Sequence, residues 1–358
     1  MGLTHHFIGG FFMFKIMVNS IRCYFFFKYN KLERRSNMSI NKLIGNTPIV
    51  KMKVQYKEKL INVFAKIEYY NYTGSIKDRL AYYIINEAYK NGSLVKNMPI
   101  IEATSGNTGI AFSALGAYYG HPVHIFMPDS ASKERIDIMK MYGANIYLIS
   151  KEKGGFKEAI RQADELAKKI NGFRPDQFNN SMNIDAHYNT TGLEIINSLP
   201  NIKINKFVSG IGTGGTLIGV AKRLKKYDSN IKVIALEPKQ LPIMTKGINN
   251  GSHKIEGIGD DFIPKIVDKS LIDKIIVIDD MDAINMSRIL AKNFGLGVGI
   301  SSGANLIASV LTAEHNDNVV TIFPDDLKKY LSTDLKKELD LNNNLFSNHI
   351  KILSIEAI

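Results

Sequence analysis

A lysine with the surroundings of a reactive amine lies in segment 71–79, which reads Asn-Tyr-Thr-Gly-Ser-Ile-Lys-Asp-Arg. Ser75 and Asp78 have the spacing of a capping box, which predicts that a helix begins here with Lys77 in its first turn. The positive end of the helix dipole disfavours a charged amine at this position. We therefore expect a lowered pKa at Lys77, which suits Schiff-base chemistry. On this segment alone, an ordinary exposed lysine is the simpler interpretation.

Two other segments have the composition of anion-binding turns. Segment 104–109, Thr-Ser-Gly-Asn-Thr-Gly, follows a predicted strand and opens a predicted helix, where hydroxyl groups and free N–H groups can hold a carboxylate or a phosphate. A plain helix cap would need fewer such residues. Segment 210–216, Gly-Ile-Gly-Thr-Gly-Gly-Thr, also lies between a predicted strand and a predicted helix. Its glycines would let backbone amides wrap closely around a phosphate group.

The residues alone leave other chemistries open. Gly210, Gly212 and Gly215 fit the dinucleotide fingerprint, and Glu237 stands where an acid that binds a ribose would be expected. A nicotinamide dehydrogenase is therefore a rival interpretation. A fourth segment, Pro-Asp-Asp at 324–326, directly follows a predicted strand. Its two carboxylates could be metal ligands, a base or part of a capped turn.

The elements that would position these segments alternate along the chain from Met38 onward. Short apolar runs are followed by helical patterns, which predicts an α/β fold with a largely parallel sheet. Such sheets bind ligands at the carboxyl ends of their strands, so we expect the four segments to face one cleft. The predicted strands are 63–67, 99–102, 123–127, 145–148, 206–209, 233–236, 275–278 and 319–323, and the predicted helices are 76–90, 108–119, 132–142, 156–169, 216–227 and 282–294.

Composition narrows the classes of function. The net charge of +12 comes partly from residues 1–37, and the remaining charge is dispersed without interleaved aromatic residues, so we expect no nucleic-acid surface. Cys23 is the only cysteine, which argues against disulfides, thiolate metal sites and a cysteine nucleophile, and fits a cytoplasmic protein. The apolar stretch 7–18 is too short to span a bilayer. We expect that translation starts at Met38 and that 1–37 are not part of the fold; the alternative is a membrane-surface anchor.

Taken together, these segments closely resemble the cysteine synthase family, the O-acetylserine sulfhydrylases of pyridoxal-phosphate (PLP) fold type II. The matching motifs follow one another in the family's order from residue 40 to residue 335. The resemblance therefore argues against the dehydrogenase interpretation. It implies a two-lobed α/β fold, similar to the tryptophan synthase β subunit, with mostly parallel sheets flanked by helices. Beyond the segments quoted above, the matching motifs lie at 43–48, 177–178, 190–192, 253–255, 299–304 and 330–333.

The resemblance also implies roles for individual residues, and it implies no metal. Lys77 would bind PLP covalently and later move the α-proton, and Asn107 would hydrogen-bond the 3′-oxygen of the cofactor. The phosphate group would be held by Gly212, Thr213, Gly214, Gly215 and Thr216. The α-carboxylate of the substrate would be held by Thr104, Ser105, Gly106, Thr108 and Gln177.

Two departures from the family pattern concern carboxylates. Asp326 stands where the family usually has a serine that contacts the pyridine nitrogen, and a carboxylate there would favour a protonated ring. In segment 257–262, Gly-Ile-Gly-Asp-Asp-Phe, Asp260 and Asp261 replace small residues of a loop that should line the mouth of the site. These two residues could form a solvated acidic loop, provide a base that activates water, or repel anionic sulfide donors.

The reaction that the resemblance implies is β-elimination followed by addition of a nucleophile. The expected reaction is O-acetyl-L-serine plus sulfide giving L-cysteine and acetate. One alternative converts L-cysteine and water to L-serine and hydrogen sulfide through a loop Asp base, and another forms cystathionine or lanthionine. A catalytically inactive partner of a serine acetyltransferase is a further alternative, against which the retention of Lys77 argues.

The resemblance also sets expectations for domains and partners. We expect one lobe at 38–182 with the reactive lysine and the substrate loop, a second lobe at 183–335 with the phosphate-binding loop, and a tail at 336–358. The expected assembly is a homodimer, with a serine acetyltransferase as a possible further partner. We expect small amino acids and sulfide as substrates, and neither nucleic acid nor membrane as a partner.

Overall fold

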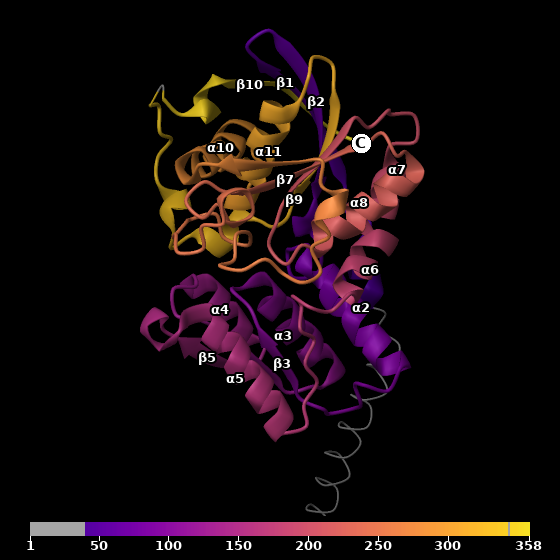
Figure 1. Ribbon diagram of the computed structural model, residues 1–358, viewed down its shortest axis with the longest axis vertical. Helices are drawn as coiled ribbons and strands as arrows, with labels where there is room; N and C mark the ends of the chain where they lie inside the picture. Colours follow the sequence, from indigo (N-terminus) through magenta and orange to yellow (C-terminus); the bar gives the residue numbers. More distant parts are fainter. Residues whose placement is uncertain (1–39, 343) are drawn as a thin grey trace, which may run out of the picture. The chain divides into compact units, whose positions relative to one another are not determined.

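The computed structural model describes residues 40–342 and 344–358 (Figure 1). Residues 43–358 form one compact unit, which contains both sheets of the protein and the helices that cover them. The expectations for residues 1–37 lie outside the described residues.

A seven-stranded sheet forms the larger layer, with strand order β10-β1-β2-β9-β6-β7-β8. The five strands from β2 to β8 in this order are parallel, whereas β1 pairs antiparallel with both β2 and β10. The bounds are β1 (Ile49–Tyr56), β2 (Lys59–Ile67), β6 (Lys206–Gly210), β7 (Lys232–Pro238), β8 (Lys274–Ile278), β9 (Asn318–Phe323) and β10 (Ile350–Ala357).

Helices cover both faces of this sheet. They are α6 (Met182–Asn189), α7 (Thr191–Ser198), α8 (Gly215–Tyr227), α10 (Asp280–Phe294) and α11 (Ile300–Thr312), with a short α9 (Ile243–Lys246). In β2, Val63 and Ala65 belong to the apolar cluster that includes α10 and α11, whereas Phe64 belongs to the cluster that includes α7 and α8. Because successive side chains of a strand point to opposite faces, these two pairs of helices lie on opposite sides of the sheet (Figure 1).

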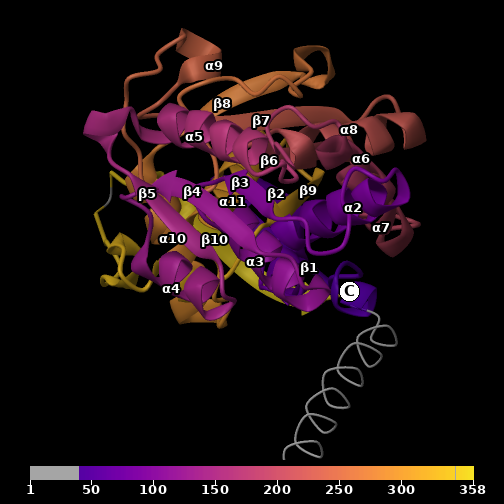
Figure 2. The same ribbon diagram turned by 90° about the horizontal axis from the view of Figure 1, so that it is seen from below.

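A second, parallel sheet has three strands in the order β3 (Ile100–Ala103), β4 (Val123–Pro128) and β5 (Asn145–Ile149). Three alanines of α5 (Gly155–Lys169) pack against Ile101 and Phe126 on one face. The helices α3 (Asn107–Tyr119) and α4 (Lys133–Met141) lie on the other side of this sheet (Figure 2). The helix α2 (Lys77–Lys90) contacts both α3 and α6, so it links the two layers.

The fold class predicted from the sequence is confirmed, and every predicted strand and helix is present with ends shifted by a few residues. The sheets, however, divide the chain differently from the expected lobe ranges. Strands β1 and β2 lie within 38–182 but belong to the seven-stranded sheet, and β10 extends the same sheet from within the expected tail 336–358. The chain forms β1 and β2 of the large sheet before it crosses to build the small sheet, and it adds the edge strand β10 last.

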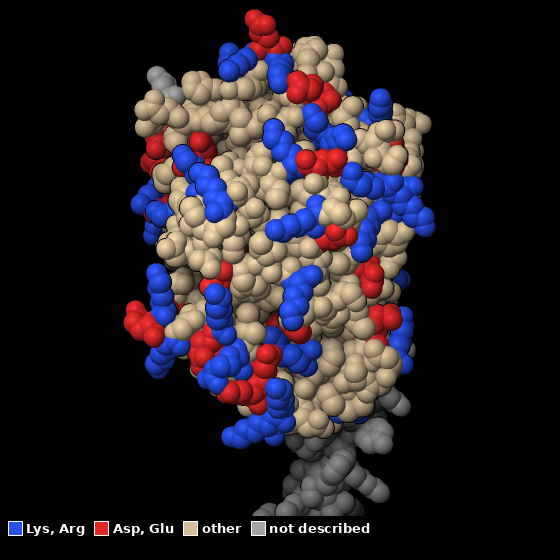
Figure 3. Space-filling model, viewed as in Figure 1, with Lys and Arg blue, Asp and Glu red and all other residues tan. Residues whose placement is uncertain are grey.

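The surface bears charges of both signs. Figure 3 shows Lys and Arg side chains interspersed with Asp and Glu over the face seen there, as in an ordinary solvated surface. No helix in the described ranges is long and apolar enough to cross a membrane. Within the same ranges, no group of three or more His, Cys, Asp or Glu side chains is arranged to hold a metal ion.

Candidate active site

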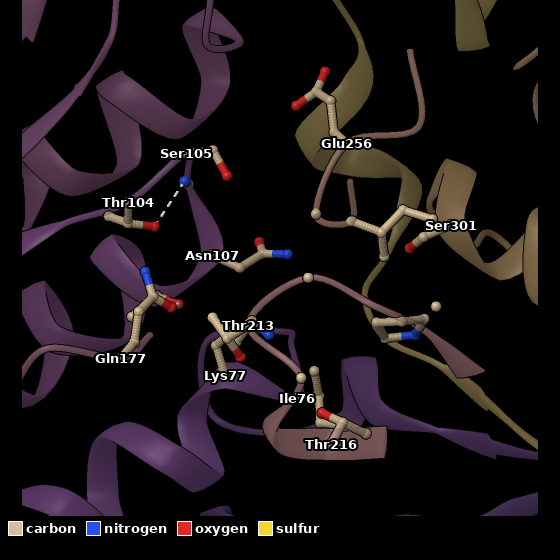
Figure 4. Close-up of a pocket in the computed structure, with 18 of the residues that line it drawn as sticks. Ile76, Lys77, Thr104, Ser105, Asn107, Gln177, Thr213, Thr216, Glu256 and Ser301 are labelled. Atoms are coloured by element: carbon tan, nitrogen blue, oxygen red, sulfur yellow. Dashed lines mark hydrogen bonds between the residues drawn. The ribbon is translucent and has the colours of Figure 1, made fainter. Parts of the chain in front are cut away.

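A cavity of about 80 Å³ lies beyond the carboxyl ends of β3, β6 and β9 and is lined from both sheets (Figure 4). Open α/β sheets bind ligands at this end of their strands, so the position is that of a binding site. Most of the predicted site residues line this cavity, namely Lys77, Thr104, Ser105, Gly106, Asn107, Thr108, Gln177, Gly212, Thr213, Gly214, Thr216 and Asp260. Of the other predicted residues, Gly215 opens α8 directly behind the glycine turn.

Lys77 is the first residue of α2, as predicted, and its side chain lines the cavity. Burial lowers the pKa of its amine, and the carboxylates of Asp260 and Asp325 oppose this shift. The predicted direction is therefore present, and burial is its main cause. The hydrogen bonds of Asp78 are not those of the expected capping box. Its carboxylate accepts two hydrogen bonds from Thr73, one from the backbone N–H at 2.7 Å and one from the side-chain hydroxyl at 2.5 Å.

The glycine turn at 212–216 is shaped for a group that needs close backbone approach. Gly214 has a φ of +89°, a conformation that favours glycine, and a Cβ at Gly212 would collide with the carbonyl oxygen of Gly257. The free N–H groups of the first turn of α8 follow at once and can bind an anion. These features fit the phosphate group of PLP.

The hydroxyl of Thr216 has a partner that the sequence analysis did not single out. His187 is buried, with Nε2 3.2 Å from Thr216 Oγ1 and Nδ1 2.9 Å from Thr191 Oγ1. Burial lowers the pKa of His187 well below its usual value, and Lys77 and Arg79 add to this effect. The ring is therefore neutral, and it contacts the hydroxyl at the end of the glycine turn.

The turn at 104–108 is held from two directions. Thr104 Oγ1 accepts a hydrogen bond from the Gly106 N–H at 3.0 Å (Figure 4). Thr108 Oγ1 donates to Gln177 Oε1 at 2.6 Å, and Gln177 Nε2 donates to the Ala103 carbonyl at 3.0 Å. The result is a small-residue turn at a helix start, which suits a carboxylate.

Asn107 has unused hydrogen-bonding capacity in the cavity wall. Its Nδ2 donates to Asp325 Oδ2 at 2.7 Å, while its buried Oδ1 has no hydrogen-bond partner. Buried polar atoms are rarely left unpaired, so this side chain fits a role in holding a bound polar group.

The three carboxylates singled out from the sequence have different positions. Asp260 lines the cavity, and burial raises its pKa to about 7, with Asp261 adding to the rise and Lys77 opposing it. Asp261 does not line the cavity; its Oδ2 lies 3.2 Å from Lys157 Nζ, in a pair in which both side chains are 40% or more exposed. The prediction that both residues reach the site therefore holds only for Asp260.

Asp326 also lies away from the cavity. Its carboxylate accepts a hydrogen bond from the Lys328 N–H at 3.0 Å and lies beside Gly74. The preceding residue, Asp325, is fully buried, accepts from Asn107 and from the Tyr330 hydroxyl, and lies 3.8 Å from Arg135. The chain is extended here, so neighbouring side chains point in opposite directions. The expected contact of Asp326 with the pyridine ring is therefore not what the structure shows.

Further residues of the cavity wall had weak or no sequence signals. Arg135 comes from α4 and pairs with Glu256, and nothing in its local sequence indicated a cavity position. Asn305 holds the end of β6 by accepting from the Gly210 N–H at 2.9 Å. Ser301 lies within the motif at 299–304 and could have been predicted from it. Glu237, the residue behind the dehydrogenase interpretation, instead binds the Met244 N–H at 2.7 Å.

Comparison with known proteins agrees with this geometry. A family model described as pyridoxal-phosphate dependent enzyme matches residues 40–325. Cysteine synthase B of Campylobacter jejuni is 42% identical over 299 residues, which cover 83% of this chain and 97% of that protein.

Solved structures give the same result. A hydrogen sulfide-producing enzyme from Fusobacterium nucleatum is 43% identical, with a TM-score of 0.84 and coverage of 91% of this chain and 100% of that one. A mutant of that enzyme, Asp changed to Asn, has been solved with an α-aminoacrylate intermediate. Cysteine synthase of Entamoeba histolytica is 38% identical, with a TM-score of 0.77 and coverage of 84% and 91%. The chain therefore belongs to the pyridoxal-phosphate dependent cysteine synthase family.

Proposed function

We propose that this PLP-dependent enzyme replaces the β-substituent of a three-carbon amino acid, with Lys77 moving the α-proton. The observation that carries the proposal is that one cavity brings together a lysine of lowered pKa, a glycine turn shaped for phosphate and a hydroxyl-rich turn shaped for carboxylate. When bound, PLP supplies the electron sink for loss of the α-proton and of the β-substituent.

The binding roles follow from the position of each group. The N–H groups of 212–216 and the Thr216 hydroxyl would hold the phosphate, and Asn107 would hold the ring oxygen of the cofactor. The turn at 104–108 would hold the α-carboxylate of the substrate, with Gln177 fixing the Thr108 hydroxyl. These contacts would place the α-carbon near the Lys77 amine, which could then accept and return its proton.

The first reaction that we propose is O-acetyl-L-serine plus sulfide giving L-cysteine and acetate. Its support is the similarity to cysteine synthases over more than four-fifths of the chain. Sulfide is partly ionised to HS− at neutral pH, and addition of HS− to the β-carbon needs no base from the protein.

A second candidate reaction is L-cysteine plus water giving L-serine and hydrogen sulfide. The observation that supports it is the position of Asp260 in the cavity wall. Water is a much weaker nucleophile than sulfide and needs a base within hydrogen-bond reach. Asp260 lies in the cavity wall, and its pKa of about 7 suits proton transfer at neutral pH. Its carboxylate would take a proton from the water as the water oxygen bonds to the β-carbon. The hydrogen sulfide-producing relative is a further support.

One assay distinguishes the two reactions. Purified holoenzyme is given O-acetylserine, cysteine or serine as first substrate, with and without sulfide, and released sulfide and amino-acid products are both measured. Cysteine formed from O-acetylserine and sulfide supports the first reaction. Serine and sulfide formed in equal amounts from cysteine alone support the second. Absence of both products, in holoenzyme that retains PLP, would contradict the proposal.

We also propose a cytoplasmic homodimer, which light scattering of the purified protein would test. A complex with a serine acetyltransferase would be tested by co-elution of the two enzymes. Because the family match begins at residue 40, we propose that a chain starting at Met38 keeps full activity and solubility. Loss of either property on removal of 1–37 would favour a membrane-surface anchor.

A further inference from the structure

The loop that carries Asp260 is fastened at both ends to helices of the three-stranded sheet. At its start, Glu256 forms an ion pair with Arg135 of α4, whose side chain is 2% exposed. Near its end, Asp261 Oδ2 lies 3.2 Å from Lys157 Nζ of α5. Asp260 lies between these two ion pairs.

The residue after Asp261 adds an apolar contact with the same helix. The ring of Phe262 is stacked with that of Phe156 of α5 at a centroid distance of 6.5 Å. It also meets the ring of Phe178 edge-on at 5.1 Å. Phe178 directly follows Gln177, and both line the cavity. The end of the loop therefore packs on α5 next to the cavity.

Asp260 and Asp261 point in different directions. Asp260 lines the cavity, whereas Asp261 is 40% exposed and pairs with Lys157. The Oδ2 atom of Asp261 is taken up by Lys157, its Oδ1 is buried without a hydrogen-bond partner, and the residue does not line the cavity. Asp261 is thus poorly placed to be a base, but it directly follows Asp260 in the chain and contacts α5.

We propose that Lys157 and Asp261 form a latch that fastens loop 256–262 to α5 and thereby holds the Asp260 carboxylate in the cavity. Asp261 is in this view a positioning residue that acts through Asp260. The inference rests on the second of the two proposed reactions, the addition of water. Because Lys157 and Asp261 are both partly exposed, the latch stabilises one loop position and contributes little to the stability of the fold.

The test uses Lys157→Gln, with Lys168→Gln as a matched control, because Lys168 is another exposed lysine of α5. We expect Lys157→Gln to lower the rate of serine formation from cysteine by about two- to fivefold, the range of a partly exposed ion pair. Sulfide release in the first turnover should stay unchanged, since Lys157 does not line the cavity. The control should match wild type in both steps.

The pH profile gives a readout that a purely structural role would not move. The charged groups that act on Asp260 are Asp261 on its own loop, which raises its pKa, and Lys77 of α2, which lowers it. In Lys157→Gln, the negative charge of Asp261 is no longer balanced by a lysine, so its effect on Asp260 is stronger and the pKa of Asp260 rises. The acid limb of the pH–rate profile of serine formation should therefore move to higher pH. Asp261→Asn removes that charge and should move the limb to lower pH. Shifts of opposite sign support the latch, whereas no shift, or shifts of the same sign, contradict it.

Hydrogen exchange of the holoenzyme tests the latch without relying on the reaction. Peptides that cover 256–262 should exchange faster in Lys157→Gln than in wild type or in Lys168→Gln. The double variant Lys157→Asp with Asp261→Lys swaps the two charges and should restore the ion pair. Hydrogen exchange in peptides that cover 256–262 should then be slower than in Lys157→Asp alone. If exchange is unchanged in Lys157→Gln, the latch is wrong even where serine is formed. If exchange rises but wild type forms no serine, the latch stands and the hydrolytic reaction fails.

Discussion

The Asp260 carboxyl and the Lys77 amine face the same cavity, and each favours the charged form of the other. Burial shifts both groups toward their neutral forms: it raises the pKa of Asp260 to about 7 and lowers the pKa of Lys77. A carboxylate that titrates near neutral pH and an amine that deprotonates readily are suited to two different proton transfers. In the proposed reactions, Lys77 would move the proton of the α-carbon, and Asp260 would take the proton of the attacking water.

Replacing Asp260 should separate the two halves of the reaction. Asp260→Asn removes the base but keeps the shape of the side chain, so serine formation from cysteine should fall roughly 100- to 10,000-fold, the usual contribution of a general base. Sulfide release in the first turnover should persist, because Lys77 is intact. The measurement is rapid-quench analysis of both products. Serine formation at the wild-type rate in this variant would exclude Asp260 as the base.

The same residue predicts the pH dependence of water addition. A base works only when ionised, so serine formation should decline as the pH falls through about 7, the pKa to which burial raises Asp260. Addition of HS− by the O-acetylserine route needs no such base, so its rate, measured with the HS− concentration held constant at every pH, should not show this limb. Stopped-time assays across the pH range check the difference. Identical acid limbs for the two routes would argue against a role for Asp260.

Lys77 should be the lysine that binds the cofactor. Lys77→Ala should give a protein that is colourless after dialysis, whereas wild type should be yellow and should keep PLP after borohydride reduction. Peptide mapping of the reduced wild-type protein should find the label in the peptide that contains Lys77. A label on Lys329, a buried lysine whose amine donates to the Gly74 carbonyl, would overturn the assignment.

The parts of the site that follow local rules could be predicted from the sequence. The turns at 104–109 and 210–216 were identifiable because each places a run of glycine and hydroxyl residues between a predicted strand and a predicted helix. The helix start at Lys77 was identifiable in the same way, from the residues before it. Strand β1 could also have been predicted, because Met52 and Val54 alternate with lysine and glutamine and are fully buried.

The remaining parts depend on tertiary contacts that leave no local pattern. Asp325 and Asp326 are alike in sequence, and only the direction of the chain after β9 decides that Asp325 is the buried one. Arg135 reaches the cavity because α4 packs beside residues 324–330, nearly 200 positions later in the chain. Strand β10 is defined mainly by its pairing with β1.

Glu194 should stabilise the region behind Lys77. It pairs with Arg79 at 2.6 Å and with Lys66 at 2.8 Å, and although burial opposes the shift, these cations lower its pKa to about 2. Glu194→Gln leaves two buried cations short of a partner, so the free energy of unfolding at pH 7 should drop by roughly 3 kcal/mol in urea titrations.

The pH dependence of this effect has a defined sign. Because the folded-state pKa of Glu194 is depressed, its stabilisation is complete above the unfolded-state value near 4.5 and is lost as the pH falls toward about 2. The difference in the free energy of unfolding between wild type and Glu194→Gln should therefore become smaller as the pH falls from about 4.5 to about 2. A difference that stays constant down to pH 3 would show that the ion pairs do not contribute as described.

Asp325 and Asp326 should differ in their effect on the site. Asp325→Asn removes a charged acceptor from Asn107 and Tyr330, so α-proton exchange in deuterated water should slow by about tenfold, in line with loss of one charged hydrogen bond. Asp326→Ser should leave the exchange rate and the cofactor spectrum unchanged, because this side chain lies outside the cavity. The reverse result would place Asp326, and not Asp325, against the cofactor.

His187 should control how tightly the cofactor phosphate is held. Thr216 can donate its hydroxyl hydrogen to a phosphate only if His187 Nε2 carries a hydrogen and donates to Thr216 Oγ1, which leaves Nδ1 to accept from Thr191. Because burial lowers the pKa of His187, the ring is neutral and can keep this arrangement over the working pH range.

His187→Ala leaves Thr216 unoriented, so the dissociation constant of PLP should rise roughly 5- to 150-fold, equivalent to the ~1–3 kcal/mol of a lost buried hydrogen bond. Titration of apoenzyme with PLP, followed by absorbance, measures this change, and His124→Gln serves as a control because His124 lies outside the cavity. Thr216→Val should weaken binding by a similar factor, and the double variant should be no weaker than either single one, because the two residues act through one hydroxyl. Additive losses in the double variant would mean that His187 supports the fold and does not orient Thr216.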